Sequence, residues 1–236
     1  MHNFFSMEIR DEEIILPEDE SSHCTRVLRL KKGDEAGVFD GNGNFYRCRI
    51  SETGSKHALL KIIETEHSDP DPWHIHVALA PTKNMNRIEW FAEKATELGI
   101  HELSFLLCSR SERKSMNPGR LNKIVIGALK QSKSKYLPVI NPMKDFEKFL
   151  VENQSARNKY ICHISDIPKE HLHEIARPGG DYLLLIGPEG DFDRQEISMA
   201  KKLGFLEVSL GRNILRTETA ALAGLHILSL INQKGT

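Results

Sequence analysis

From Trp73 onward, short apolar segments alternate with amphipathic ones. The apolar segments have the length and β-branched character of buried strands, and they occupy residues 73–80, 102–108, 160–164 and 182–186. Strands that alternate with helices form a parallel sheet with helices on its faces. The sequence therefore predicts an α/β domain built on a parallel sheet.

Helix start and stop signals mark three of the intervening segments. Residues 87–98 carry an apolar stripe that ends at Gly99, and Asn117-Pro118 begins a second stripe that continues toward Pro138. Asp193-x-x-Glu196 has nearly the pattern of a capping box, and the helix that it begins should stop at Gly204.

The first 65 residues have a different character. Short strand-like segments are separated by turns there, and Asn42-Gly43 is a hairpin signal because that turn needs positive φ. Several short strands without a long helical period indicate a small β-barrel. The expected strands are residues 36–40, 44–50 and 57–63.

A proline-rich acidic segment, residues 68–72, separates these two regions. Two prolines so close together disfavour both a helix and a central strand. We therefore expect two domains, a β-barrel over residues 1–70 and the α/β domain over residues 71–236.

The composition is that of a globular protein, with 39% hydrophobic and 28% charged residues. No apolar run has the length of a membrane span, and the N-terminus lacks a secretion signal, so a cytoplasmic protein is expected. The cysteines are widely spaced and form no C-x-x-C pair, which favours reduced thiols; they are Cys24, Cys48, Cys108 and Cys162.

Basic residues are concentrated in one part of a chain whose net charge is -1. Between Cys108 and Tyr136, the only acid is Glu112. Such segregation indicates a phosphate-facing surface, although a solvated basic helix has the same pattern. The basic residues are Arg110, Arg113, Lys114, Arg120, Lys123, Lys130, Lys133 and Lys135.

The C-terminal segment, residues 217–231, is apolar around almost its whole circumference. A helix with so little polar face has to be covered on two sides. Its own sheet can cover one side. We expect a second copy of the chain to cover the other in a homodimer, with deep burial in a monomer as the alternative.

Two loops have the character of ligand-binding loops. The apolar strand at residues 182–186 continues into Gly187-Pro188-Glu189-Gly190, where glycines would let a ligand lie against the backbone. Residues 209–220 form a similar loop between a strand and a helix, and Arg216 in it is a candidate to hold a charged oxygen. A tight connection without a ligand, and a surface ion pair for Arg216, are the alternatives.

Five segments share their order and spacing with one known family. They are Val27-Leu28-Arg29-Leu30, Glu93-Lys94-Ala95-Thr96-Glu97-Leu98-Gly99, Ser111-Glu112-Arg113, Gly187-Pro188-Glu189-Gly190, and Leu210-Gly211 with Ile214-Leu215-Arg216-Thr217-Glu218-Thr219-Ala220. Together they resemble, nearly from end to end, the RsmE family of 16S ribosomal RNA uracil-N3 methyltransferases.

The resemblance implies a SPOUT-type catalytic domain with a C-terminal trefoil knot, a PUA-like N-terminal barrel and a homodimer. General topology alone would argue against a knot. The resemblance also implies S-adenosylmethionine as the methyl donor. The donor site would be formed by Leu185, Gly187, Pro188, Glu189, Gly190, Leu210, Gly211, Ile214 and Leu215.

Some positions depart from the family pattern. Asp191 stands where the family usually has a glycine, Arg212-Asn213 replaces Pro-Arg, and Lys130-Gln131 replaces Glu-Gln. The opening residues also lack an early arginine that many members have.

Methylation of uracil N3 removes a proton from that nitrogen, so the site needs a base or a charge stabiliser. Arg216 is expected to stabilise negative charge on the uracil oxygens, and Glu218 or Glu189 to accept the proton, with helix capping as the alternative role of both acids. The base must be unstacked to react. The residues expected to hold the RNA are Arg26, Arg29, Lys31, Lys32, Arg110, Arg113 and Lys114.

Other functions are weighed against this one. Methylation of transfer RNA or of another ribosomal base fits the loops equally well, and a non-catalytic RNA-binding protein would bind no donor. The chain lacks both G-x-G-x-x-G and G-x-x-x-x-G-K-[ST], which argues against a nicotinamide or P-loop enzyme. No metal is expected, because His74-x-His76 and His171-x-His173 lack further ligands nearby. Whether the substrate is free 16S RNA or the assembled small subunit stays open.

Overall fold

The computed structural model describes residues 1–54, 56–117, 119–165 and 167–233. They form two compact units. Unit 1 comprises Met1–Pro70 with Ile126–Leu137, and unit 2 comprises Asp71–Val125 with Pro138–Thr236. None of the helices in the described ranges has the length and apolar character needed to cross a membrane.

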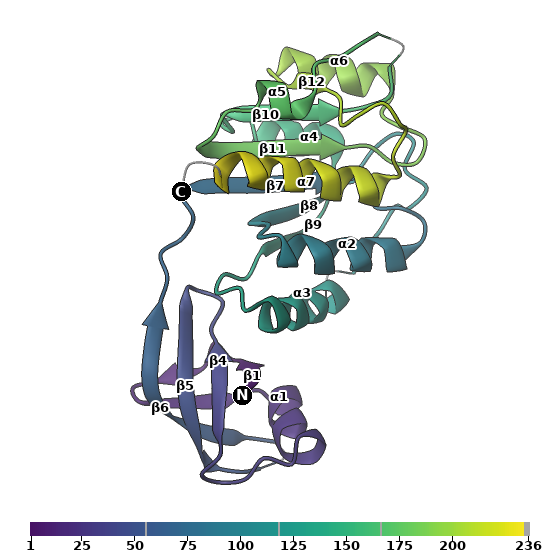
Figure 1. The fold of residues 1–236 in the computed structure, drawn as a ribbon. Coiled ribbons are helices and arrows are strands. Elements are labelled where there is room, and N and C mark those ends of the chain that lie inside the picture. The colour runs from purple at the N-terminus through teal and green to yellow at the C-terminus, as the bar shows by residue number, and fades with distance from the viewer. Residues whose placement is uncertain (55, 118, 166, 234–236) are drawn as a thin grey trace. The chain divides into compact units, whose positions relative to one another are not determined.

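Unit 2 contains a parallel sheet, as predicted, with strand order β12-β10-β11-β7-β8-β9 (Figure 1). The expected strands are present, with ends that differ from the prediction by up to two residues. The strands are β7 (Trp73–Leu79), β8 (Glu102–Leu107), β9 (Val139–Asp145), β10 (Asn158–Cys162), β11 (Gly180–Ile186) and β12 (Leu206–Val208).

Helices cover both faces of this sheet. The helix α7 (Thr217–Gln233) packs on β7 and β11 and contacts α2 (Met85–Glu97) and α5 (Leu172–Ile175). On the other face, α4 (Phe146–Glu152) packs on β8 and β9 and contacts α6 (Arg194–Lys202). Figure 1 shows α7, the yellow helix, lying along the sheet.

The helix signals of the sequence have the expected effect where they can be assessed. Asn84 caps α2 by accepting from the Asn86 N–H, and Gly99 follows that helix with φ +77°. Asp193 and Glu196 form a reciprocal capping box at the start of α6. Pro118 lies outside the described residues, and α3 is described from Gly119 to Ser132.

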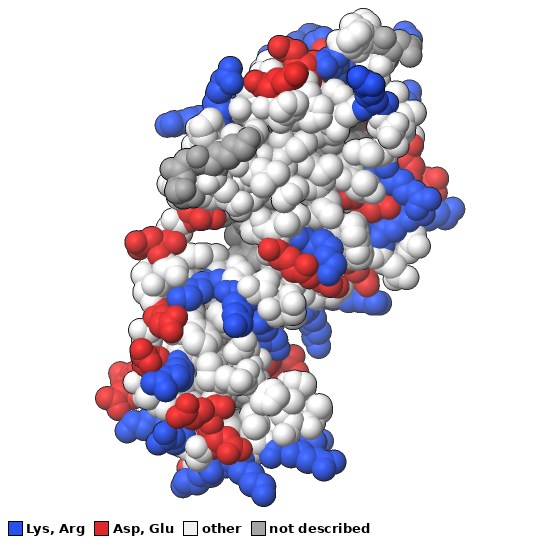
Figure 2. All heavy atoms as spheres, viewed as in Figure 1, with Lys and Arg blue, Asp and Glu red and all other residues white. Residues whose placement is uncertain are grey.

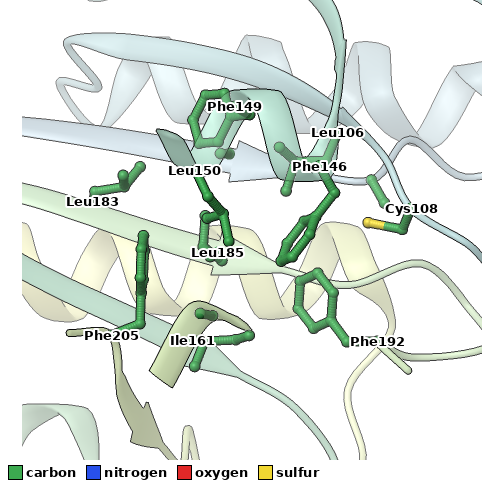
Figure 3. Packing of buried hydrophobic residues seen from close by; sticks show 13 residues of the cluster. Leu106, Cys108, Phe146, Phe149, Leu150, Ile161, Leu183, Leu185, Phe192 and Phe205 are labelled. Atoms are coloured by element: carbon green, nitrogen blue, oxygen red, sulfur yellow. The ribbon is translucent and has the colours of Figure 1, made fainter. Parts of the chain in front are cut away.

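The core beneath α4 and α6 follows the alternation of β11. Leu183 and Leu185 point to this face, where they pack with Phe146 and Phe149 of α4 and with Phe205 (Figure 3). Because neighbouring strand residues point to opposite faces, Leu184 and Ile186 point toward α7.

The backbone of α7 lies very close to β11 at Gly224. A Cβ atom there would be 2.4 Å from Leu184 Cδ2, so only glycine fits without displacement. The outer side of α7 is only partly covered, and Leu230 is 44% exposed. This packing places the first turn of α7 near the carboxyl ends of the strands.

Unit 1 contains a six-stranded sheet with order β1-β4-β5-β6-β3-β2. The chain after the edge strand β1 reaches the other end of this sheet, where Ser6 Oγ donates to the carbonyl of Ile15 in β3 at 2.5 Å. The elements are β1 (His2–Phe5), β2 (Ile9–Arg10), β3 (Glu13–Leu16), α1 (Glu18–Ser22), the π-helical turn η1 (His23–Val27), β4 (Glu35–Phe39), β5 (Asn44–Glu52) and β6 (Ala58–His67).

The second half of α3 packs within unit 1. Leu129 is fully buried against Phe5 and Phe39, and Lys130 forms an ion pair with Glu20. This ion pair gives a structural reason for the lysine that departs from the family pattern. The four cysteines are free thiols, as expected.

Candidate donor and acceptor site

One cavity of unit 2 has a volume of about 550 Å³ and lies at the carboxyl ends of three neighbouring strands. Because β10 lies between β11 and β12, the loops that follow these strands meet there. Such a volume suits a nucleoside-sized ligand. The walls include apolar side chains from each strand end or loop, among them Ile164, Ile186, Val208, Leu210, Ile214 and Leu215.

Most of the predicted donor-site residues line this cavity. They are Gly187, Pro188, Glu189, Leu210, Gly211, Ile214 and Leu215, and Arg216 lines it as well. Leu185 and Gly190 do not. The Leu185 side chain lies in the core under α4 and α6 because it alternates with Ile186, and Gly190 packs against the stem of Arg110.

One wall of the cavity was not anticipated. It is formed by Cys162, the last residue of β10, and by residues of the loop that follows, among them His163, Ile164 and Lys169. The sequence shows an apolar strand followed by polar residues there, but only the strand order places this loop between the two predicted ones. Burial raises the pKa of the Cys162 thiol to about 12, so it stays protonated.

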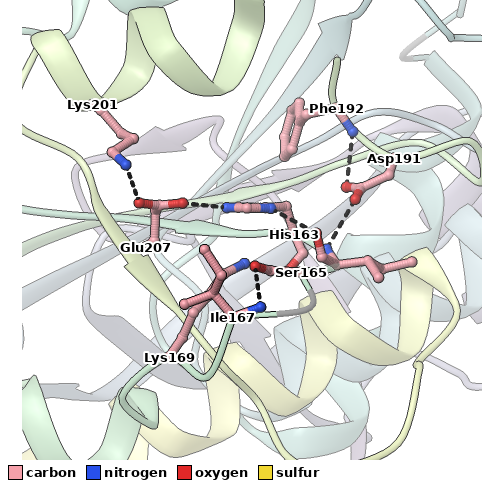
Figure 4. Close-up of polar contacts among 9 residues, drawn as sticks. His163, Ser165, Ile167, Lys169, Asp191, Phe192, Lys201 and Glu207 are labelled. Carbon is pink, nitrogen blue, oxygen red and sulfur yellow. Dashed lines mark hydrogen bonds and ion pairs between the residues drawn. The ribbon is translucent and has the colours of Figure 1, made fainter. Parts of the chain in front are cut away.

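Asp191 ties this loop to the one after β11. Its carboxylate accepts from the N–H of Ile164 at 2.9 Å and from its neighbour Phe192 at 2.8 Å (Figure 4). Asp191 has φ +62°, a conformation that favours glycine and that aspartate tolerates better than most residues. This conformation explains the family's glycine, and the side chain here adds a link that glycine lacks.

His163 connects the same loop to β12. Its Nε2 lies 2.8 Å from Glu207 Oε1, and its Nδ1 lies 2.9 Å from the Ile164 carbonyl oxygen. The hydrogen bond from Lys201, followed by the one from His163, lowers the pKa of Glu207. Lys169 donates to the His163 carbonyl at 2.6 Å, and burial lowers the pKa of Lys169 (Figure 4).

Two of the predicted RNA-binding arginines contact backbone carbonyls of unit 2. Arg110 donates to the carbonyl of Gly190 at 2.9 Å, and Arg113 donates to those of Thr82 and Lys83. Glu189 Oε1 accepts from the Lys83 N–H at 3.1 Å. These contacts hold the loops after β7 and β11 in place.

The other basic residues are divided between ion pairs and solvent. Arg120 pairs with Glu89, and Lys135 pairs with Glu66. The remaining predicted RNA-binding side chains are exposed, and none has an ion pair within the described ranges; they are Arg26, Arg29, Lys31, Lys32 and Lys114.

The predicted catalytic residues lie at the start of α7. The Arg216 side chain is exposed and has no hydrogen-bond or ion-pair partner among the described residues. Glu218 is only 6% exposed, and its Oε1 lies 3.7 Å from Arg87 Nε. Its Oε2 is buried and has no hydrogen-bond partner in the described part of the chain. Thr217 Oγ1 donates to the Gly187 carbonyl at 3.0 Å, which joins α7 to the first loop.

Within the described ranges, no group of three or more His, Cys, Asp or Glu side chains is placed to hold a metal ion. His76 is buried, with Nε2 2.8 Å from Ser104 Oγ and Nδ1 3.7 Å from Glu102. His171 and His173 lie against each other at the start of α5.

Family models match both regions of the chain. A model described as an RNA methyltransferase domain matches residues 69–229, and one described as an RNA methyltransferase PUA domain matches residues 16–63. A relative from Aquifex aeolicus, named ribosomal RNA small subunit methyltransferase E, is 27% identical and aligns with 97% of this chain and 99% of its own length.

The chain belongs to the RsmE family of ribosomal RNA methyltransferases.

Solved structures agree with the RsmE fold. A probable rRNA methyltransferase from Porphyromonas gingivalis is 32% identical, with a TM-score of 0.90 and 100% of each chain covered. A small subunit methyltransferase E from Neisseria gonorrhoeae, solved bound to S-adenosyl methionine, is 27% identical with a TM-score of 0.88 over 98% of each chain.

Proposed function

We propose that this protein transfers a methyl group from S-adenosylmethionine to N3 of a uridine in 16S ribosomal RNA, and that it acts in the cytoplasm during ribosome assembly. The proposal rests on the cavity that three loops form at the strand ends. Arg216 lines this cavity, and its side chain has no partner among the described residues. Family membership and a donor-bound relative support the same function.

The cavity fits the donor. Its volume of about 550 Å³ suits a nucleoside, and its apolar walls from Ile186, Val208 and Leu210 suit an adenine ring. S-adenosylmethionine supplies an electrophilic methyl group on a sulfonium centre. Gly187 and Gly211, which have no side chain, present their backbone to the same space.

The reaction makes two bonds, N3–C and the O–H bond on the proton acceptor, and breaks two, C–S and N3–H. The uracil N3 electron pair forms the new N–C bond while the methyl C–S bond breaks, sulfur keeps that electron pair, and the N3 proton leaves. Arg216 stabilises the negative charge on the uracil oxygens, and Glu218 accepts the proton. The buried Oε2 of Glu218, which lacks a partner in the described residues, supports placing this acid in the reaction.

The proposed domain roles follow the family. Residues 1–70 serve as the RNA-binding PUA-like domain, and residues 71–236 serve as the methyltransferase domain. The RNA is held by the exposed basic side chains of unit 1 together with Lys114, Arg110 and Arg113; those of unit 1 are Arg26, Arg29, Lys31 and Lys32.

The proposed topology includes the trefoil knot of SPOUT enzymes. After β12, at one edge of the sheet, the chain returns through residues 209–216 to α7, which packs on β7 and β11. This return passes the ends of β10 and β11 and is the segment that a knot would require.

The proposed assembly is a homodimer through the outer side of α7. Residues 219–233 contain no charged side chain, and Figure 2 shows a broad uncharged area over this helix. Leu222, Ala223 and Ile227 are half-buried, and Leu230 is exposed, so this face has room for a second copy.

Transfer of a labelled methyl group tests the substrate class. The protein is incubated with methyl-labelled S-adenosylmethionine and unmodified small subunits, free 16S RNA or transfer RNA. Label in either 16S sample but not in transfer RNA is expected. Label in transfer RNA alone would contradict the proposed substrate. The amounts of label in small subunits and in free 16S RNA show which of these two the enzyme methylates.

A further inference from the structure

A second cleft lies beside the donor cavity. It is open to solvent, has a volume of about 650 Å³ and shares four wall residues with the donor cavity. The shared residues are Arg87, Ile214, Leu215 and Arg216, and the others are Asn86, Trp90, Glu218 and Thr219. A ligand in the second cleft is therefore adjacent to one in the first.

Three polar side chains of this cleft have no partner among the described residues. Within the described ranges, no hydrogen bond or ion pair engages the side chains of Asn86, Arg216 or Thr219, and the Trp90 indole is 44% exposed. Arg110 and Arg113, in contrast, are engaged by backbone carbonyls. Hydrogen-bond donors without a protein partner, next to an exposed aromatic ring, are typical of a site that binds a nucleobase.

The cleft is also electropositive. It lies at the N-terminal ends of α2 and α7, where the helix dipole favours negative charge. Arg87 projects from α2 and lines both cavities. Glu218, with its side chain 8% exposed, lies 3.7 Å from Arg87 Nε and also lines the cleft.

We propose that this second cleft receives the unstacked target uracil, with Trp90 stacked on the ring and Arg87 beside its carbonyl oxygens. Glu218 is then also the positioning residue that holds Arg87 between the two cavities. The inference rests on the proposed function and adds to it the place of the acceptor base. Two arginines and two helix ends would stabilise the charge that N3 gains as its proton leaves.

Tryptophan emission reports this binding directly. The protein has two tryptophans, so Trp73→Phe leaves Trp90 as the single emitter. Titration of that variant with oligouridylate, and separately with free unmodified 16S RNA, should quench the Trp90 emission to saturation. Arg87→Met in the same background should weaken the quenching. Unchanged emission with both RNAs overturns the proposal.

Kinetics separate this inference from the proposed function. Trp90→Ala should raise the KM for 16S RNA by about 10-fold, as expected for the loss of one base stack, and should leave the Kd of S-adenosylhomocysteine unchanged. Trp90→Phe should restore most of the loss. Equal KM values for the wild type and Trp90→Ala would overturn this inference and leave the proposed function intact. The same conclusion holds if Trp90→Ala changes the oligomeric state without changing the KM. If the wild-type protein makes no methyluridine, the proposed function is overturned. Quenching of Trp90 emission does not depend on methyl transfer, so it still tests whether the cleft binds a base.

Discussion

The carboxylate of Asp191 accepts a hydrogen bond from the Ile164 backbone N–H at 2.9 Å. This bond joins the loop after β11 to the loop after β10, two walls of one cavity. The family's usual glycine at this position would satisfy φ +62° but would leave the two loops unlinked.

Asp191→Gly should therefore weaken donor binding without unfolding the protein. Loss of the charged acceptor should raise the Kd of S-adenosylhomocysteine by about 10-fold, while relief at positive φ keeps the melting temperature near that of the wild type. Asp191→Asn keeps one acceptor and should give an intermediate Kd. Calorimetric titration measures both, and a wild-type Kd for Asp191→Gly would show that the link does not hold the site.

Arg216→Ala should abolish most methyl transfer while donor binding survives. Removal of one charge-stabilising donor in an active site typically costs about 100-fold or more in rate. Arg194→Ala is the matched control, because Arg194 is also exposed at a helix start but lines neither cavity. Single-turnover transfer and S-adenosylhomocysteine titration are the measurements. Unchanged transfer by Arg216→Ala would remove this residue from the mechanism.

Gly224→Ala and Gly127→Ala should change stability in opposite directions. A methyl group at Gly224 meets Leu184 at 2.4 Å, so overpacking should cost about 1–3 kcal/mol. Gly127 in α3 has nothing within 4 Å, and alanine there should stabilise by about 0.5–1 kcal/mol through helix propensity. Urea unfolding gives both values. Equal stability of the two variants would contradict the close approach of α7 to β11.

His76 should make stability depend on pH. Its pKa is lowered to about 4, mainly by burial and to a smaller extent by His74. The negative charge of Glu102 acts in the opposite direction. The ordinary value is about 6.5, so the unfolded chain takes up a proton that the folded chain does not. Stability is then full above about pH 6.5, falls as the pH drops, and levels off near pH 4, with a total loss of up to about 3 kcal/mol.

Comparison with His76→Gln isolates this contribution. The groups around His76 are Glu102, His74, Ser104 and Phe149, and they remain in the variant. The difference in unfolding free energy between pH 7.5 and pH 5 should be smaller for His76→Gln than for the wild type. The same pH dependence in both proteins would show that His76 is not the group responsible.

The sequence was sufficient for the features that depend on local order. Residues 182–186 are apolar and lead into glycines, and Asp193 and Glu196 form the capping box that their spacing predicts. The loop after β10 was missed, because its place between two ligand loops follows from strand order, which periodicity does not reveal. The cleft at Arg87 and Trp90 was missed for a related reason, since α2 and α7 are more than 100 residues apart and meet only in the fold.

The uses of Arg110 and Lys130 also required the structure. Both belong to a basic segment, yet Arg110 holds the Gly190 carbonyl and Lys130 pairs with Glu20. A cluster of basic residues in a sequence does not show which of them bind a carbonyl group or an acid within the protein. The exposed residues Arg26 and Lys114 remain predicted RNA contacts.

The identity of the methylated nucleoside tests the central claim most directly. The 16S RNA recovered after reaction with methyl-labelled S-adenosylmethionine is digested to nucleosides and separated by mass, with synthetic N3-methyluridine as the standard. Label that co-elutes with N3-methyluridine, and is absent with Arg216→Ala, is the predicted result. Label in any other nucleoside, with none in N3-methyluridine, would contradict the account.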